Sequence, residues 1–151
     1  MIAIYRKVSE GIYTQYHDDD QEDGFLPITT TYDGTLGETT ETLLYVKNDN
    51  ELFYYTDISV TPIAKRDPDD VSFEATGHGV KVRVGETRPT EAEWDTVDYG
   101  AAITLDDLGA SGEADVNSAL PFWCRVECPA GATADNRENV VLRLSFTEDV
   151  V

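Results

Sequence analysis

Residues 119–128, ALPFWCRVEC, and residues 139–148, NVVLRLSFTE, decide the fold of this chain. In both stretches apolar side chains recur at every second position, which is typical of a β-strand with one buried face and one wetter face. The loop Pro129–Glu138 joins the two stretches. The C-terminal part of the chain is therefore predicted to be antiparallel β-structure. In the first strand, one face is expected to carry Phe122, Cys124, Val126 and Cys128, and the other Trp123, Arg125 and Glu127.

Similar strand patterns, separated by turn signals, recur upstream of these two strands. About seven strands are expected after Glu38, at the 8–12-residue spacing that is typical of a β-sandwich. One helix is also expected, because Thr90-Glu91-Ala92-Glu93 is a capping box that satisfies N–H groups at a helix N-terminus. The turn at Asp98-Tyr99-Gly100 limits this helix to one or two turns. The predicted fold is an all-β antiparallel sandwich over residues 36–151 with one short helix.

The first 16 residues are predicted to form a β-hairpin around the turn Ser9-Glu10-Gly11, where glycine tolerates the positive φ of a tight turn. This hairpin lies outside the strands that were counted for the sandwich. Its apolar face must therefore be covered either by the same domain or by a neighbouring subunit. Residues 1–35 are assigned to an N-terminal hairpin and arm. The predicted partner-binding residues are Ile2, Ile4, Tyr5, Tyr13, Tyr16, Phe25 and Leu26.

An acidic segment, His17–Gly24 (HDDDQEDG), follows the hairpin. Counted from Asp19, it places Asp19, Gln21, Asp23 and Gly24 at positions 1, 3, 5 and 6 of a calcium-binding loop. Position 12 is Thr30 instead of a bidentate glutamate, and the flanking residues have strand patterns. A solvated acidic turn is the preferred interpretation, and loose Ca²⁺ binding by Asp19 and Asp23 is the alternative.

The two cysteines, Cys124 and Cys128, lie four positions apart on one predicted strand. That spacing separates them by about 13 Å, whereas a disulfide requires Cα atoms within about 7 Å. The two histidines, His17 and His78, are distant in sequence, and the cysteine spacing does not suit tetrahedral zinc. Both cysteines are interpreted as core thiols.

The net charge of −19 and the lack of a basic stripe argue against nucleic acid and anionic membranes as partners. The first residues lack the apolar core of a signal peptide, and no run approaches the ~18 apolar residues of a membrane-spanning helix. Synthesis in a cytoplasm is expected. Neither Gly-x-Ser-x-Gly nor His-Glu-x-x-His occurs, so no catalytic residue is predicted.

Residues 123–131, WCRVECPAG, fit the pattern aromatic-x-Arg-Val-x-x-Pro-x-Gly and lead into Val140–Leu144. This resembles the penultimate and last strands of immunoglobulin-like domains. Together with Leu44–Asn48 and Ile58–Pro62, the chain is similar to immunoglobulin-like proteins encoded among the structural genes of tailed bacteriophages. The resemblance covers roughly residues 36–150. It implies an immunoglobulin-like sandwich and carries no catalytic residues over.

The resemblance further implies a non-enzymatic virion protein, assembled in the host cytoplasm and present in several copies or as a homo-oligomer. The expected role is capsid decoration or cement, with the N-terminal arm bound to major capsid or tail subunits. The alternative is a carbohydrate- or host-surface-binding module of a tail, baseplate or fibre. That alternative needs an exposed aromatic platform, for which the candidates are Tyr54, Trp94 and Tyr99.

Overall fold

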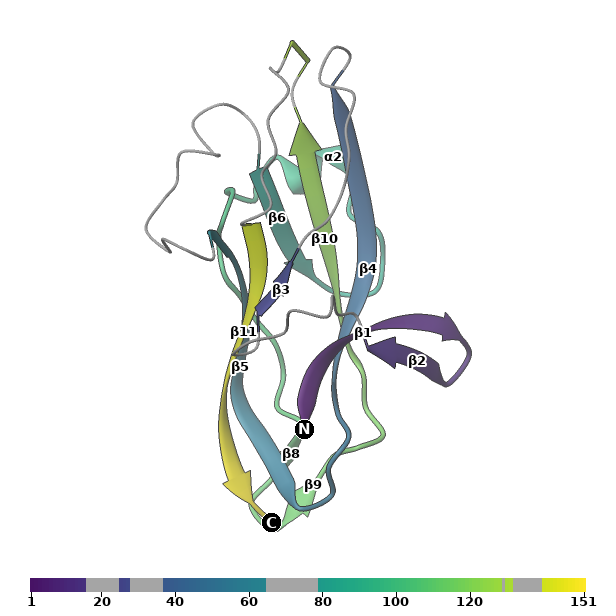
Figure 1. Ribbon diagram of the computed structural model, residues 1–151, viewed down its shortest axis with the longest axis vertical. Helices are drawn as coiled ribbons and strands as arrows, with labels where there is room; N and C mark the ends of the chain where they lie inside the picture. Colours follow the sequence, from purple (N-terminus) through teal and green to yellow (C-terminus); the bar gives the residue numbers. More distant parts are fainter. Residues whose placement is uncertain (16–24, 28–36, 65–78, 129, 132–139) are drawn as a thin grey trace.

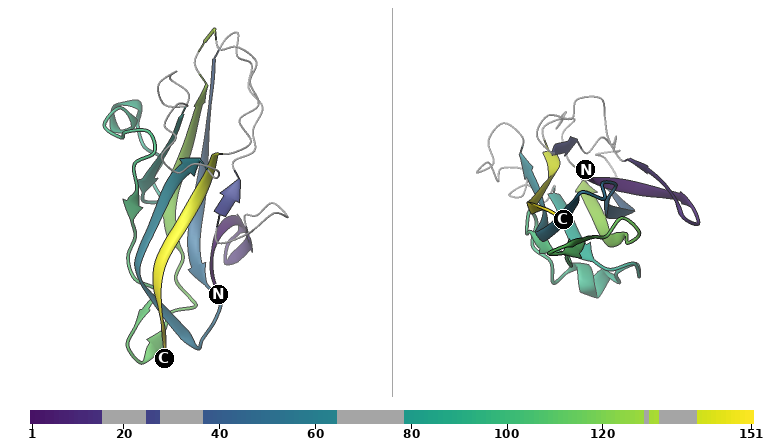
Figure 2. Two further views of the ribbon diagram at one scale, coloured as in Figure 1. Left: turned by 60° about the vertical axis from the view of Figure 1, so that its left-hand side comes forward. Right: turned by 90° about the horizontal axis from the view of Figure 1, so that it is seen from below.

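Two antiparallel β-sheets pack face to face in the computed structural model (Figures 1 and 2). The larger sheet contains, in spatial order, β2 (Ile12–Gln15), β1 (Ile2–Ser9), β4 (Glu38–Asn48), β10 (Leu120–Cys128) and β6 (Gly79–Val84). The smaller sheet contains β3 (Phe25–Pro27), β11 (Val140–Val150), β5 (Phe53–Ala64) and β7 (Ile103–Thr104). A separate ribbon pairs β8 (Gly109–Ala110) with β9 (Glu113–Ala114). The structure describes residues 1–15, 25–27, 37–64, 79–128, 130–131 and 140–151.

The all-β antiparallel architecture confirms the prediction from the strand patterns. The described part of the chain contains one helix, α2 (Glu91–Trp94), at the predicted capping box. The backbone N–H of Thr90 donates to Glu93 Oε2 at 2.8 Å, and the backbone N–H of Glu93 donates to Thr90 Oγ1 at 3.3 Å. These two bonds satisfy N–H groups that the first turn of a helix leaves without partners.

The core lies between the two sheets and draws on both of them. Its largest fully buried members include Phe122 and Leu44 from the larger sheet and Tyr55, Ile58 and Leu142 from the smaller one. Cys124 also lies in this core, and burial raises the pKa of its thiol to about 12. Neither cysteine forms a disulfide. Within the described residues, no helix has the length and apolar character needed to cross a membrane.

The last two strands lie in different sheets. β10 pairs with β4 on one side and β6 on the other, whereas β11 pairs with β5 and β3. In an immunoglobulin domain the last two strands, F and G, share one sheet. β10 and β11 therefore lie on opposite sides of the core. Each pairs with its neighbours in antiparallel fashion, as the sequence predicted.

A β-bulge in β5 shifts the two-residue alternation expected from the sequence. Ser59 pairs with Ser145, but Thr56 pairs with Thr147, so two β5 residues oppose one residue of β11. Asp57 takes the left-handed conformation at the bulge, with φ 53°, and Thr147 Oγ1 donates to its carboxylate at 3.1 Å. As a result, Tyr55 and Ile58 are both fully buried, although strict alternation places them on opposite faces.

The predicted hairpin of β1 and β2 is present, and Gly11 has φ 69° at its turn. β1 also pairs with β4 from Ile2↔Asn48 to Tyr5↔Tyr45. Ile2 and Ile4 are 4% and 1% exposed and belong to the common core. The sequence allowed either the same domain or a neighbouring subunit to cover the apolar face of the hairpin. For Ile2 and Ile4, the cover is the same sandwich. The boundary predicted between residues 35 and 36 lies outside the described residues.

Candidate functional site

The N-terminal hairpin projects from one edge of the larger sheet (Figure 1). β4 pairs with only the first half of β1, and the second half pairs with β2, from Tyr5↔Gln15 to Ser9↔Ile12. Near its turn the hairpin exposes Val8 and Ile12, at 66% and 57%. Apolar side chains on a projecting sheet edge are typical of a surface that contacts another molecule.

Tyrosines fix the orientation of this hairpin on the outer face of β4. The Tyr13 ring meets the Tyr45 ring edge to face at 5.3 Å, and Lys47 Nζ lies 4.9 Å from the centre of the Tyr13 ring. Tyr45 is buried, and its hydroxyl donates to Glu86 Oε1 at 3.2 Å. Burial and then the Glu86 carboxylate raise the pKa of Tyr45. Tyr13 therefore serves to anchor the hairpin.

Tyr5 has a similar anchoring contact closer to the N-terminus. Its hydroxyl lies 3.4 Å from Asp49 Oδ2, and the N-terminal ammonium pairs with the same carboxylate. Burial, followed by the charge and hydrogen bond of Asp49, raises the pKa of Tyr5. Tyr5 and Tyr13, two of the predicted partner-binding residues, are thus half-buried against the sheet, while Ile2 and Ile4 lie inside it.

β2 differs from the other described sheet edges because it is longer than β3 and β7 and, unlike β6, carries no charged side chain. β3 is three residues long and contains Pro27, β7 has two residues, and β6 carries Lys81 and Arg83. Short strands, proline and charged side chains are the usual protection of a sheet edge. β2 reads Ile-Tyr-Thr-Gln, with no charge in a chain that is 27% charged. This edge is chemically suited to accept a further strand.

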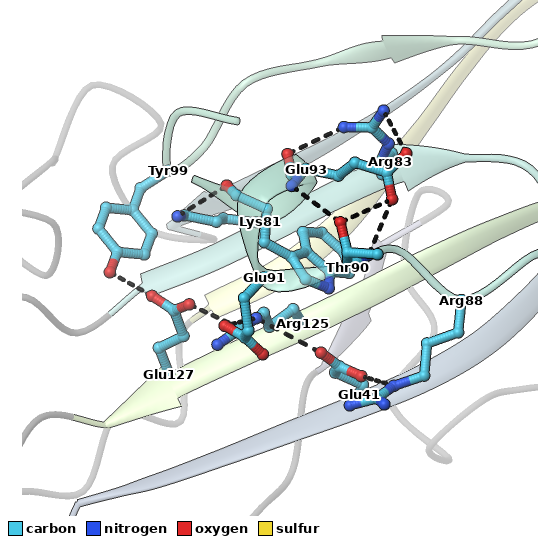
Figure 3. A network of polar contacts seen from close by, with 11 residues as sticks. Glu41, Lys81, Arg83, Arg88, Thr90, Glu91, Glu93, Tyr99, Arg125 and Glu127 are labelled. Atoms are coloured by element: carbon cyan, nitrogen blue, oxygen red, sulfur yellow. Dashed lines mark hydrogen bonds and ion pairs between the residues drawn. The ribbon is translucent and has the colours of Figure 1, made fainter. Parts of the chain in front are cut away.

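The opposite edge of the same sheet, β6, is covered by the segment that contains α2 (Figure 3). Lys81 Nζ donates to the carbonyl of Trp94 at 3.1 Å, and Arg83 Nη1 donates to the carbonyl of Glu93 at 2.9 Å. Both cations thus satisfy carbonyls at the C-terminal end of the helix, where positive charge is favourable. The backbone N–H of Gly100 also donates to the carbonyl of Val80 at 3.0 Å.

Arg125, on the outer face of β10, joins the two sides of this cover (Figure 3). Its Nη1 lies 2.9 Å from Glu91 Oε2 on the helix and 3.4 Å from Glu41 Oε1 on β4. Its Nε lies 2.7 Å from Glu127 Oε1 without the alignment of a hydrogen bond. Glu41 also accepts from Arg88 Nε. The Arg125 and Glu41 side chains at the centre of this network are 10% and 9% exposed and so are shielded from solvent, whereas Glu91 and Arg88 at its ends are 71% and 67% exposed.

The three rings predicted for a carbohydrate platform do not form one, because Trp94 is completely buried beneath the cover. Its ring centre lies 5.7 Å from the guanidinium carbon of Arg125. Tyr99 is half-buried, donates to Glu127 Oε2 and has Lys81 Nζ 4.7 Å above its ring. Burial and the contact with Glu127 raise the pKa of Tyr99 to about 12. Tyr54 belongs to the smaller sheet.

Several predicted site residues lie outside the described residues: Tyr16, Asp19 and Asp23, together with the two histidines. Phe25 and Leu26 belong to β3, where they pair with Arg143 and Leu142 of β11. Among the residues that the structure describes, no group of three or more His, Cys, Asp or Glu side chains is arranged to hold a metal ion.

Sequence reasoning did not select Val8, Ile12 or the partners of Arg125 as functional residues. The lack of charge in residues 12–15 is a readable signal of an unprotected edge, once that segment is known to be an outer strand. The pairing of Arg125 with Glu41 has no local signal, because it depends on the register of two strands 84 positions apart.

Comparison of this chain with protein-family models, with curated proteins and with solved structures found no match.

Proposed function

We propose that this protein is a non-enzymatic structural protein of a tailed-phage particle, and that it decorates the capsid in several copies. The sequence resemblance of residues 123–131 to phage immunoglobulin-like proteins and the antiparallel two-sheet architecture support the setting, although β10 and β11 do not share a sheet as immunoglobulin strands F and G do. The single observation that carries the mode of action is the uncharged, exposed edge of β2 on a projecting hairpin. A particle protein with this edge attaches to its neighbours by adding their strand to its own sheet.

Strand addition uses the chemistry that β2 presents. The edge offers backbone N–H and C=O groups in a row, so that main-chain hydrogen bonds supply affinity and flanking side chains supply specificity. Val8 and Ile12 would lose their exposed apolar surface in such a contact. Tyr13 and Tyr5, by anchoring the hairpin to the sheet, reduce the conformational entropy that is lost when it binds.

Charge restricts where a neighbour can approach. The whole chain has a net charge of −19, but residues 1–16 contain Arg6 and Lys7 against one acid, Glu10. Most of the surface repels acidic partners, which keeps the free protein soluble. The hairpin is one part of the described surface where this repulsion is relieved, and residues 79–90, with Lys81, Arg83 and Arg88 against Glu86, are another.

The role is tested by binding to particles. Particles made without this protein are mixed with the purified wild-type chain or with Ile12→Glu, and are then pelleted. Val84→Glu is the matched control, because Val84 is 50% exposed and lies on the opposite edge strand β6.

Wild type and Val84→Glu are expected to pellet with the particles, and Ile12→Glu is expected to remain in the supernatant with an unchanged circular dichroism spectrum. Wild type that stays in the supernatant contradicts the particle role. Ile12→Glu that pellets like wild type contradicts the assignment of the site.

A further inference from the structure

We propose a carbohydrate site at Trp123, on the outer face of the larger sheet, where the indole ring stacks on a neutral sugar and the polar side chains beside it bind the sugar hydroxyl groups. This inference goes beyond the proposed function, because it uses neither β2 nor the exposed side chains of the hairpin. The ring also differs from the three that the sequence suggested for a sugar platform.

Trp123 is held in place on an inner strand of the sheet. β10 lies between β4 and β6, and Trp123 is directly opposite Leu43 on one side and Arg83 on the other. Its indole Nε1 donates to the carbonyl of Glu86 at 3.0 Å. The chain has two tryptophans, and Trp94 is completely buried whereas Trp123 is half-buried. Trp123 therefore carries the indole surface that a ligand can reach.

The polar side chains beside this ring occur in pairs of opposite charge. Arg83 Nη2 lies 3.5 Å from Glu93 Oε1, and the two side chains are 34% and 48% exposed. Arg88, whose side chain is 67% exposed, pairs with Glu41. In Figure 3, Arg83 and Arg88 both lie on the side of the picture away from Tyr99. This region thus offers hydrogen-bond donors and acceptors with little net charge, in a chain whose net charge is −19.

These features suit a neutral carbohydrate. One face of a sugar ring presents C–H groups, which pack on an aromatic ring, and its edge presents hydroxyl groups, which both donate and accept hydrogen bonds. A charged ligand would have to compete with one partner of each ion pair.

A protein partner would need a larger apolar surface than this one, because a stable interface buries about 800 Å² on each side. The exposed apolar residues Val8 and Ile12 lie on the hairpin, and Leu52 lies in the turn between β4 and β5. The surroundings of Trp123 are instead one aromatic ring with paired polar groups, which favours the sugar.

The test uses the full chain with neutral oligosaccharides, namely maltohexaose, cellohexaose, chitohexaose and mannohexaose, and with a heparin hexasaccharide as the anionic comparison. Acrylamide quenching of tryptophan emission reports on Trp123, because Trp94 is completely buried. At least one neutral sugar is expected to lower the quenching constant of wild type by about twofold or more, since the bound sugar shields the ring.

Isothermal titration calorimetry with that sugar then assigns the site. Trp123→Ala is expected to weaken binding by about tenfold or more, because the stacking surface is lost. Trp123→Phe keeps an aromatic ring and is expected to weaken binding less. Leu52→Ala is the matched control, because Leu52 is 67% exposed and lies away from the larger sheet face, so it is expected to bind like wild type. Circular dichroism checks that each variant is folded.

Three outcomes overturn the inference: no neutral sugar protects wild type from quenching, heparin alone protects it, or folded Trp123→Ala binds the sugar as tightly as wild type. The wild-type quenching decides the matter even if Trp123→Ala does not fold. The particle assay is independent of this test, because β1 and β4 separate β2 from β10. Ile12→Glu is accordingly expected to bind the sugar like wild type.

Discussion

The two edges of the larger sheet, β2 and β6, have opposite chemistry. β6 carries Lys81 and Arg83, and the α2 segment covers it through hydrogen bonds and ion pairs. β2 is uncharged and exposed, and it projects beyond the sandwich. The same sheet therefore uses charged residues to close one edge, whereas no described strand pairs with the outer side of the other. This difference supports the proposal that the uncharged edge serves association, whereas the contacts on the covered edge serve stability.

The largest effect is expected when the clamp on the closed edge loses its central cation. Arg125→Ala removes the cation between the largely buried Glu41 and Glu127 and leaves them, among the described residues, only Arg88 and Tyr99 as partners, which is expected to cost about 3–5 kcal/mol of unfolding free energy. Arg88→Ala is the control, because this side chain is 67% exposed and solvent screens its charge, so a much smaller loss of stability is expected. Urea unfolding measures both. Equal effects of the two changes would contradict the clamp.

In the hairpin that carries β2, strand β1 should divide into a structural part and a binding part. Ile4 is 1% exposed, so Ile4→Ala is expected to cost about 2–4 kcal/mol through lost burial and a cavity. Val8 is 66% exposed, so Val8→Ala is expected to change stability by about 0.5 kcal/mol or less. Thermal unfolding of the two variants tests this division. A large loss of stability in Val8→Ala would show that the projecting half is also part of the fold.

A smaller effect is expected where β6 meets its cover at Gly79. A Cβ atom at this position would lie 2.1 Å from Tyr99 Cδ1, so the ring must move and weaken its contacts with Lys81 and Glu127. Gly79→Ala is expected to cost about 1–3 kcal/mol. The matched control is Gly79→Ala in a Tyr99→Ala background, where the added methyl group should cost much less. Equal costs in both backgrounds would contradict the close contact.

The smallest effect is expected from titration of Tyr99. Its pKa is about 12, above the ordinary value of 10.0, because burial and Glu127 disfavour the phenolate. The unfolded chain releases this proton near pH 10, so the contribution of Tyr99 is fully present below pH 10 and is lost as the pH rises toward 12. Tyr99→Phe should therefore show a shallower fall in stability over that interval than wild type. Denaturant unfolding at stepped alkaline pH measures the difference, and identical slopes would contradict this assignment.

Local patterns predicted much of the fold and one part of the candidate site. The capping box at Thr90 and the hairpin turn at Gly11 were both found where the sequence placed them. Each depends on residues within a few positions of one another. The register of β5 was not predictable in this way, because the bulge at Asp57 shifts the alternation by one residue. The expectation that Trp94 is exposed on a sugar-binding platform was wrong. Its burial depends on Arg125 and on strands far away in the chain, which no local pattern reveals.

The sequence by itself determined that this chain is built of antiparallel strands, since the alternation of apolar residues is a local property of each strand. The tertiary structure alone decided that β10 and β11 lie in different sheets. It also decided that β1 completes the core and that β6 is covered while β2 is open. These outcomes depend on which strands become neighbours, and alternation is the same for any choice of neighbour.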